Sequence, residues 1–98
     1  ILSGGANIYP AEIEAAIDGF PGVRSSAVIG LKDEDMGQAV HAIVDMPGAA
    51  ATADALQAYL TDRLARYKIP RSFEFVNEPL RDDAGKTRRS QLLKERSQ

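Results

Sequence analysis

A lysine near the C-terminus has the sequence context best suited to binding a phosphate group. Lys86 lies in the stretch PLRDDAGKTRR, residues 79–89, and Arg88 and Arg89 follow it closely. A lysine ammonium on a loop at the start of a helix is a mobile point charge that can contact an anion. We therefore keep Lys86 as a candidate phosphate contact, with an ordinary solvated lysine as the alternative.

The same stretch does not match the phosphate loop of nucleotide triphosphatases. That motif ends in Gly-Lys-Thr, as residues 85–87 do, but it also requires glycine at position 80, where this chain has Leu80. Only 11 residues follow Thr87, too few to complete the parallel sheet that such a loop serves. A triphosphatase is therefore rejected.

A second stretch, SGGANIYP at residues 3–10, has paired glycines that could bring backbone close to a ligand. Gly4 and Gly5 can adopt positive φ and place no side chain in the way. A simple turn into the following helix explains the same pair, so spacing alone leaves both interpretations open.

The remaining candidate side chains do not form a recognisable site. The chain has no cysteine and one histidine, which argues against a metal or redox role. We expect His41 to be structural or on the surface, because no serine or cysteine pattern suggests a triad. Glu12 and Glu14 diverge on a predicted helix and are assigned to first-turn stabilisation. The acidic run 33–35 lacks calcium-loop spacing and predicts a solvated turn.

Composition and charge describe one ordinary globular domain with an uneven charge distribution. The chain has 98 residues, of which 44% are hydrophobic and 27% charged. Residues 1–62 carry two basic and nine acidic side chains, whereas residues 63–98 carry ten basic and five acidic ones. The basic C-terminal third predicts an anionic partner.

The hydropathy of the chain predicts its location, and its first residue predicts that it is part of a larger protein. No apolar run approaches the roughly 18 residues of a membrane span, and no signal segment is present, so we expect a cytoplasmic location. The first residue is Ile1 and no polar tail precedes the first motif, so we expect a piece of a larger protein.

The first half of the chain predicts a helix followed by two strands. Residues 7–20 have apolar residues at helical spacing, with Pro10 in the first turn. Residues 23–31 and 38–46 predict two strands joined as a hairpin-like unit through an acidic loop. The second strand should alternate between two faces, with Val40, Ala42 and Val44 on one and His41, Ile43 and Asp45 on the other.

The second half predicts a helix, a strand and a helix. Thr52 should cap a helix that ends before Pro70, with an apolar stripe up to Tyr67, which we assign to the core. Residues 73–76 predict a short strand, residues 77–85 a loop and residues 87–96 a short basic helix. This order predicts an α+β fold with a small, mostly antiparallel sheet and packed helices.

Four segments, in this order and spacing, resemble the C-terminal domain of the adenylate-forming superfamily. They are SGGANIYPAEIE, GLKDEDMGQAVHAIV, ARYKIP and PLRDDAGKTRR, and the resemblance covers essentially all 98 residues. The superfamily includes acyl-CoA synthetases, firefly luciferase and the adenylation domains of peptide synthetases. The Gly-Gly-x-Asn-Ile-Tyr-Pro segment is similar to the acid-CoA ligase branch, which implies a fatty, aromatic or related carboxylic acid as substrate.

The resemblance implies that residues 1–98 are a single lid domain that swings on a large N-terminal adenylation domain, its main partner, which this chain lacks. Family members use ATP to convert an acid to an acyl-adenylate and then transfer the acyl group to CoA, with Mg²⁺ bound by the N-terminal domain. Lys86 matches the adenylation lysine, whose ammonium would contact the acid carboxylate and the α-phosphate.

Further residue roles follow from the same resemblance. Gly4, Gly5 and Ala6 match the loop that lines the tunnel for the pantetheine arm of CoA, and Lys68 is assigned as a phosphate contact on the CoA side. Gly85 would form the turn of the lysine loop. Arg89 would support that loop or the contact between domains. No metal ligand is implied in this chain.

An alternative is a free-standing module that binds an acyl carrier protein or nucleic acid through the basic third. Nucleic acid is disfavoured because the basic residues are not interleaved with exposed aromatics and the three phenylalanines are assigned to the core. We therefore predict an AMP-forming acid-CoA ligase, inactive as this fragment alone, with no nucleic-acid partner.

Overall fold

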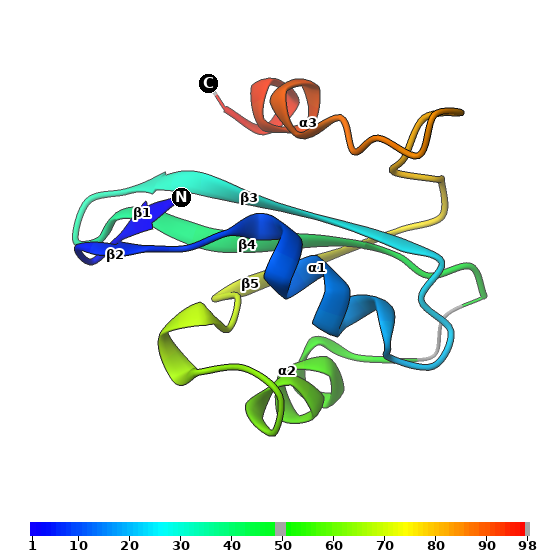
Figure 1. Ribbon diagram of the computed structural model, residues 1–98, viewed down its shortest axis with the longest axis horizontal. Helices are drawn as coiled ribbons and strands as arrows, with labels where there is room; N and C mark the ends of the chain where they lie inside the picture. The colour runs from blue at the N-terminus through cyan, green and yellow to red at the C-terminus, as the bar shows by residue number, and fades with distance from the viewer. Residues whose placement is uncertain (49–50, 98) are drawn as a thin grey trace.

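A three-stranded sheet lies between α3 on one face and α1 and α2 on the other (Figure 1). The computed structural model describes residues 1–48 and 51–97. The elements in chain order are β1 (Leu2–Ser3), β2 (Ala6–Asn7), α1 (Pro10–Asp18), β3 (Ser25–Asp33), β4 (Gly37–Asp45), α2 (Ala53–Thr61), the 3₁₀ turn η1 (Arg66–Lys68), β5 (Ser72–Val76) and α3 (Arg89–Arg96). Within these ranges, no helix has the length and apolar character to cross a membrane.

The main sheet has the strand order β3–β4–β5 and is mixed. β3 and β4 form the predicted antiparallel unit, in which Ser25 lies opposite Asp45. β5 pairs in parallel with β4, beginning with Ser72 opposite His41. Parallel neighbours need a long crossover, and residues 46–71, which include α2, provide it.

The predicted alternation along residues 38–46 is confirmed, and it divides the core into two clusters. One cluster joins the sheet to α1 and α2 and includes Val40, Ala42, Val44, Ile13, Ile17, Leu56 and Leu60. The other lies under α3 and consists of Ala27, Ile29, Ile43, Leu80 and Leu92. Leu80 is therefore a core residue at the position where a phosphate loop would have glycine.

α2 is shorter than predicted, and this changes the environment of Tyr67. Thr52 caps the helix as predicted, accepting a hydrogen bond from the Ala55 N–H at 3.1 Å. The helix ends at Thr61, and Ala65 has an extended ψ of 143° before η1. The break in helical backbone leaves Tyr67 56% exposed, so its assignment to the core was wrong.

α2 begins where predicted, whereas the other two helices begin later than predicted. α1 begins at Pro10, and Asn7, expected near its start, lies in β2 instead. α3 begins at Arg89 because Thr87 pairs with Arg81 in an isolated antiparallel bridge. The short sheet β1–β2, which Gly4 and Gly5 connect, was not predicted.

Candidate functional site

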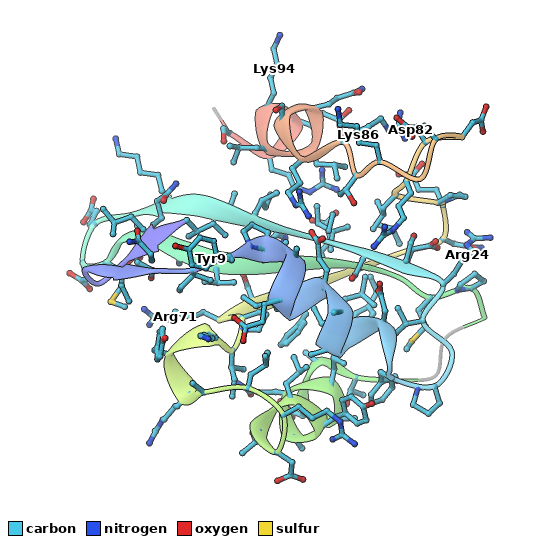
Figure 2. All side chains as sticks on the ribbon, viewed as in Figure 1. Tyr9, Arg24, Arg71, Asp82, Lys86 and Lys94 are labelled. Carbon is cyan, nitrogen blue, oxygen red and sulfur yellow. The ribbon has the colours of Figure 1, made fainter. Side chains whose placement is uncertain are left out.

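Lys86 lies on a loop that Asp82 closes. Asp82 Oδ1 accepts hydrogen bonds from the backbone N–H groups of Ala84 and Lys86, at 3.0 and 2.9 Å. The Gly85 N–H donates to Asp82 O at 2.8 Å, and the Asp82 N–H donates to Lys86 O at 2.9 Å. Gly85 has a φ of +77°, which residues with a side chain rarely adopt. These bonds define the turn and leave Lys86 exposed (Figure 2).

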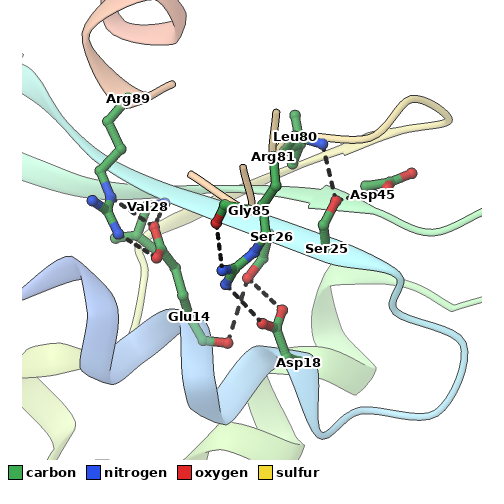
Figure 3. Close-up of polar contacts among 10 residues, drawn as sticks. All are labelled: Glu14, Asp18, Ser25, Ser26, Val28, Asp45, Leu80, Arg81, Gly85 and Arg89. Atoms are coloured by element: carbon green, nitrogen blue, oxygen red, sulfur yellow. Dashed lines mark hydrogen bonds and ion pairs between the residues drawn. The ribbon is translucent and has the colours of Figure 1, made fainter. Parts of the chain in front are cut away.

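Two arginines join the Lys86 loop to α1 (Figure 3). Arg81 Nη2 lies 3.5 Å from Asp18 Oδ2, and Arg81 Nη1 donates to Gly85 O at 3.3 Å. Arg89 Nε donates to Glu14 Oε2 at 2.8 Å, and Arg89 Nη2 donates to Glu14 Oε1. Of the predicted site residues, Lys86, Gly85 and Arg89 are therefore brought together in one region.

Glu14 is a buried ion-pair partner, and its assignment to first-turn stabilisation was wrong. The residue is only 3% exposed, because position 14 lies on the side of α1 that faces β3. Its Oε2 also accepts the Val28 N–H at 2.8 Å. Such partners are needed because a buried carboxylate without them is costly. Glu12, by contrast, lies in the first turn as predicted.

The Gly4–Gly5 turn presents bare backbone. The φ values of Gly4 and Gly5 are +58° and +85°. The Gly4 N–H donates to Met36 O at 2.9 Å, and a Cβ added to Gly4 would lie 2.9 Å from Met36 Cε. A Cβ added to Gly5 would meet no atom within 4 Å in the part of the chain that the structure describes. The turn is therefore held at Gly4 and open at Gly5.

A groove of about 1090 Å³ extends from this turn to α2 and η1. Gly4 and Ala6 line it from the β1–β2 side, Ala58 from α2, Tyr67 from η1 and Arg71 from the residue before β5. The exposure of Tyr67 is thus explained by its place on the groove. Gly5 and Lys68 are each adjacent in sequence to a lining residue, and neither lines the groove itself.

Lys68 forms an ion pair within the domain. Its Nζ lies 2.9 and 3.0 Å from the two carboxylate oxygens of Glu12. The hydrogen bond to Glu12 raises the pKa of Lys68 above its ordinary value. A phosphate bound by Lys68 would therefore share the ammonium with Glu12.

His41 belongs to a polar cluster that joins the sheet to the end of α3. Its Nδ1 lies 2.6 Å from Ser72 Oγ and its Nε2 lies 3.1 Å from Glu74 Oε1. Arg96 donates to both Glu74 oxygens, at 2.7 and 2.6 Å. These bonds outweigh the effect of partial burial and lower the pKa of Glu74 to about 2. The contacts fit the structural role expected for His41.

The two candidate loops lie apart in the fold. Asp82, Asp18 and Arg81, which hold the Lys86 loop, were not identified from the sequence. The Lys86 loop lies beside α3, whereas β1 and β2 lie at the opposite end of the molecule (Figures 1 and 2). An aspartate before a glycine turn is a signal that could have identified Asp82. Asp18 follows Glu14 by one helical turn, but no local pattern indicates that their partners are Arg81 and Arg89.

Comparison with known proteins shows the same domain in larger enzymes. Residues 12–86 match the family model described as the AMP-binding enzyme C-terminal domain. A 3-[(3aS,4S,7aS)-7a-methyl-1,5-dioxo-octahydro-1H-inden-4-yl]propanoyl:CoA ligase from Rhodococcus jostii (strain RHA1) is 43% identical over 96 residues, which cover 97% of this chain and 19% of the relative. The fatty acid–[acyl-carrier-protein] ligase ScoC from Streptomyces coeruleorubidus is 41% identical over 93 residues, covering 94% of this chain and 18% of the relative.

A solved structure agrees with the fold. The Mycobacterium tuberculosis fatty acyl CoA synthetase superposes with a TM-score of 0.90 at 42% sequence identity, over 99% of this chain and 19% of that chain. The chain therefore spans about a fifth of the length of these larger proteins. Sequence and fold lead to the same conclusion: the chain belongs to the family of AMP-binding enzyme C-terminal domains, the small domain of adenylate-forming enzymes.

Proposed function

We propose that the chain is the C-terminal lid of an AMP-forming acid-CoA ligase, in which Lys86 supplies positive charge to the adenylation step. In that step a carboxylate oxygen of the acid attacks the α-phosphorus of ATP, the bond to pyrophosphate breaks, and an acyl-adenylate forms. Negative charge builds up on the oxygens around phosphorus, where an ammonium stabilises the transition state. The observation that carries the proposal is an exposed lysine on a loop closed by Asp82, in a chain of this family.

The size of the expected effect follows from electrostatics. Two unit charges about 4 Å apart at an effective dielectric near 20 interact by roughly 4 kcal/mol. Removing one electrostatic partner of a transition state lowers a rate by ~100-fold to ~1000-fold. In the full-length protein, Lys86→Ala should lower acid-dependent pyrophosphate exchange by that factor and spare thioester formation from preformed acyl-adenylate.

Lys94→Ala is the matched control, because Lys94 is also an exposed lysine and lies on α3 (Figure 2). This variant should leave both half-reactions unchanged. An equal loss of both half-reactions in Lys86→Ala would contradict the proposed role of the lysine.

We assign the Gly4–Gly5 turn to the second half-reaction. There the thiol sulfur attacks the acyl carbon, the thiol proton is released, and AMP leaves as the thioester forms. A narrow pantetheine arm needs bare backbone beside it, and the open space around Gly5 together with the groove lined by Gly4 and Ala6 supports this role.

The acyl acceptor is proposed to be CoA. One relative is described as a CoA ligase and another as a ligase for an acyl carrier protein, and both acceptors present a pantetheine thiol. The Gly-Gly-x-Asn-Ile-Tyr-Pro segment, similar to the CoA-ligase branch, favours CoA. Thioester formation from one acyl-adenylate, compared with CoA and with holo-acyl carrier protein as acceptors, tests this assignment.

ATP and the acid would be bound chiefly by the N-terminal domain. Residues 1–48 and 51–97 contain no group of three or more His, Cys, Asp or Glu side chains that could hold a metal ion. We propose that Mg²⁺ is held by the N-terminal domain together with the phosphates of ATP. The 98-residue chain alone should therefore catalyse neither half-reaction. Turnover by the chain alone would contradict the lid assignment.

A further inference from the structure

The segment that carries Lys86 is attached on both sides to one helix. Arg81 precedes Lys86 and reaches Asp18, and Arg89 follows it and reaches Glu14 (Figure 3). We propose that Glu14 and Asp18 are positioning residues for Lys86, acting through Arg89 and Arg81. This inference rests on the proposed role of Lys86 in adenylation.

The two arginines act close to the lysine. Arg89 lies three residues after Lys86 and begins α3. Arg81 forms the bridge with Thr87, and its guanidinium donates to Gly85 O, one residue before Lys86. A shift of either guanidinium would therefore move the backbone that carries the Lys86 side chain.

The two carboxylates are themselves fixed to the sheet. Glu14 Oε2 accepts the Val28 N–H of β3 at 2.8 Å, and Asp18 Oδ1 accepts the hydroxyl of Ser26, also on β3, at 2.7 Å. They lie one turn apart on α1 and so share a face of that helix. The arginines are thus held by groups whose own positions are set by β3.

Buried apolar side chains lie farther along the chain from Lys86 than Arg81 and Arg89 do. The nearest buried apolar side chains on each side are Leu80 and Leu92, each six residues from Lys86. The Leu80 N–H donates to Ser25 Oγ at 3.0 Å, which fixes the start of the segment. Residues 81–86 are all exposed. Asp82 fixes the shape of the loop, and the ion pairs of Arg81 and Arg89 fix its position relative to α1.

The test uses the full-length protein and measures the two half-reactions separately. Glu14→Gln removes the charge that pairs with Arg89 but keeps the side-chain shape and an oxygen for the Val28 N–H. Because a misplacement of about 1 Å costs ~100-fold in rate, we expect adenylation to fall by about 10-fold to 100-fold. Thioester formation from preformed acyl-adenylate should stay at the wild-type rate.

A second variant and a control support the test. Asp18→Asn should give the same selective defect with a smaller size, because the Arg81–Asp18 pair is longer, at 3.5 Å. If Glu14→Gln fails to fold, Asp18→Asn still tests the positioning role. Glu74→Gln breaks the ion pair with Arg96 at the other end of α3, and should leave both half-reactions near wild type.

A positioning role also predicts dependence on Lys86. In a Lys86→Ala background, Glu14→Gln should cause no further loss of adenylation, because the group that it positions is gone. The same fold-loss in both backgrounds, a parallel loss of thioester formation, or a wild-type adenylation rate would overturn the positioning role. Normal adenylation in Lys86→Ala alone would instead overturn the proposed function of the lysine.

Discussion

The Lys86 loop and the Gly4–Gly5 turn are built in opposite ways. The Lys86 loop is held by charged side chains, with Asp82 closing its backbone and Arg81 and Arg89 joining it to α1. The Gly4–Gly5 turn is held by backbone, through strand pairing and the bond from the Gly4 N–H to Met36 O.

This difference matches the two proposed tasks. A loop that delivers one charge to a transition state needs that charge at a fixed point, which the ion pairs with Glu14 and Asp18 on α1 provide. A turn that borders the narrow pantetheine arm needs free space beside its backbone, and glycine provides that space because it has no side chain. Substitutions in the Lys86 loop should therefore lower adenylation, and substitutions in the Gly4–Gly5 turn should lower thioester formation.

After the ~100-fold to ~1000-fold loss of adenylation expected for Lys86→Ala, the next largest effect is the loss of thioester formation in Gly5→Leu. The turn requires positive φ at Gly5, where L-residues are strained by about 1–2 kcal/mol, and the leucine side chain would fill the open space beside the turn. We expect thioester formation to fall by about 100-fold, with pyrophosphate exchange unchanged.

Gly48→Leu is the control that distinguishes backbone strain at a positive-φ glycine from obstruction of the pantetheine arm by the leucine side chain. Gly48 also has positive φ, +67°, and a Cβ there would also meet no atom of residues 1–48 and 51–97 within 4 Å. This variant should leave thioester formation near wild type. If both leucine variants lose the thioester step equally, backbone strain explains the defect and the turn has no special role.

A smaller effect is expected when the closure of the Lys86 loop is weakened. Asp82→Ala removes the acceptor of two backbone N–H groups, and a hydrogen bond to a charged group contributes about 1.5 kcal/mol or more. Adenylation should fall by about 10-fold, since about 1.4 kcal/mol equals a factor of ten. Asp82→Asn keeps an oxygen acceptor and should retain most of the rate in the same assay.

The pH dependence of stability should identify the contact at the far end of α3. The pKa of Glu74 is about 2 in the folded domain, below its ordinary 4.5, so the ionised form stabilises folding above about pH 4.5. That contribution is lost as the pH falls towards 2. Urea midpoints of wild type and Glu74→Gln should therefore differ near neutral pH and converge in acid, while a constant difference would contradict the role of the ion pair.

The smallest effect is expected at Lys68. If its ammonium contacts a CoA phosphate, Lys68→Gln should raise KM for CoA a few-fold, whereas Glu12→Gln, which releases the lysine, should not raise it. An unchanged KM in Lys68→Gln would remove this residue from the CoA site.

The strands and the division of the core follow from local sequence patterns. Alternating apolar residues place Val40 and Ile43 on opposite faces, and this pattern depends only on the geometry of a strand. Thr52 was likewise predictable, because an N-cap contacts a backbone group three residues away.

The errors concern contacts between distant residues. Glu14 looked like a first-turn acid, since its partner Arg89 is 75 residues away in sequence. The apolar helical pattern that begins after Thr52 includes Tyr67, but the helix ends before it, in the crossover to β5. Tyr67 therefore lies on the groove and not in the core. No periodicity within a single segment carries this information.

The division of labour between the two loops is tested by comparing Lys86→Ala and Gly5→Leu in the full-length protein, with both half-reactions measured for each. We expect a crossed result, in which Lys86→Ala loses adenylation and keeps thioester formation, and Gly5→Leu loses thioester formation and keeps adenylation. If each variant loses both half-reactions to the same degree, the two loops do not serve separate half-reactions.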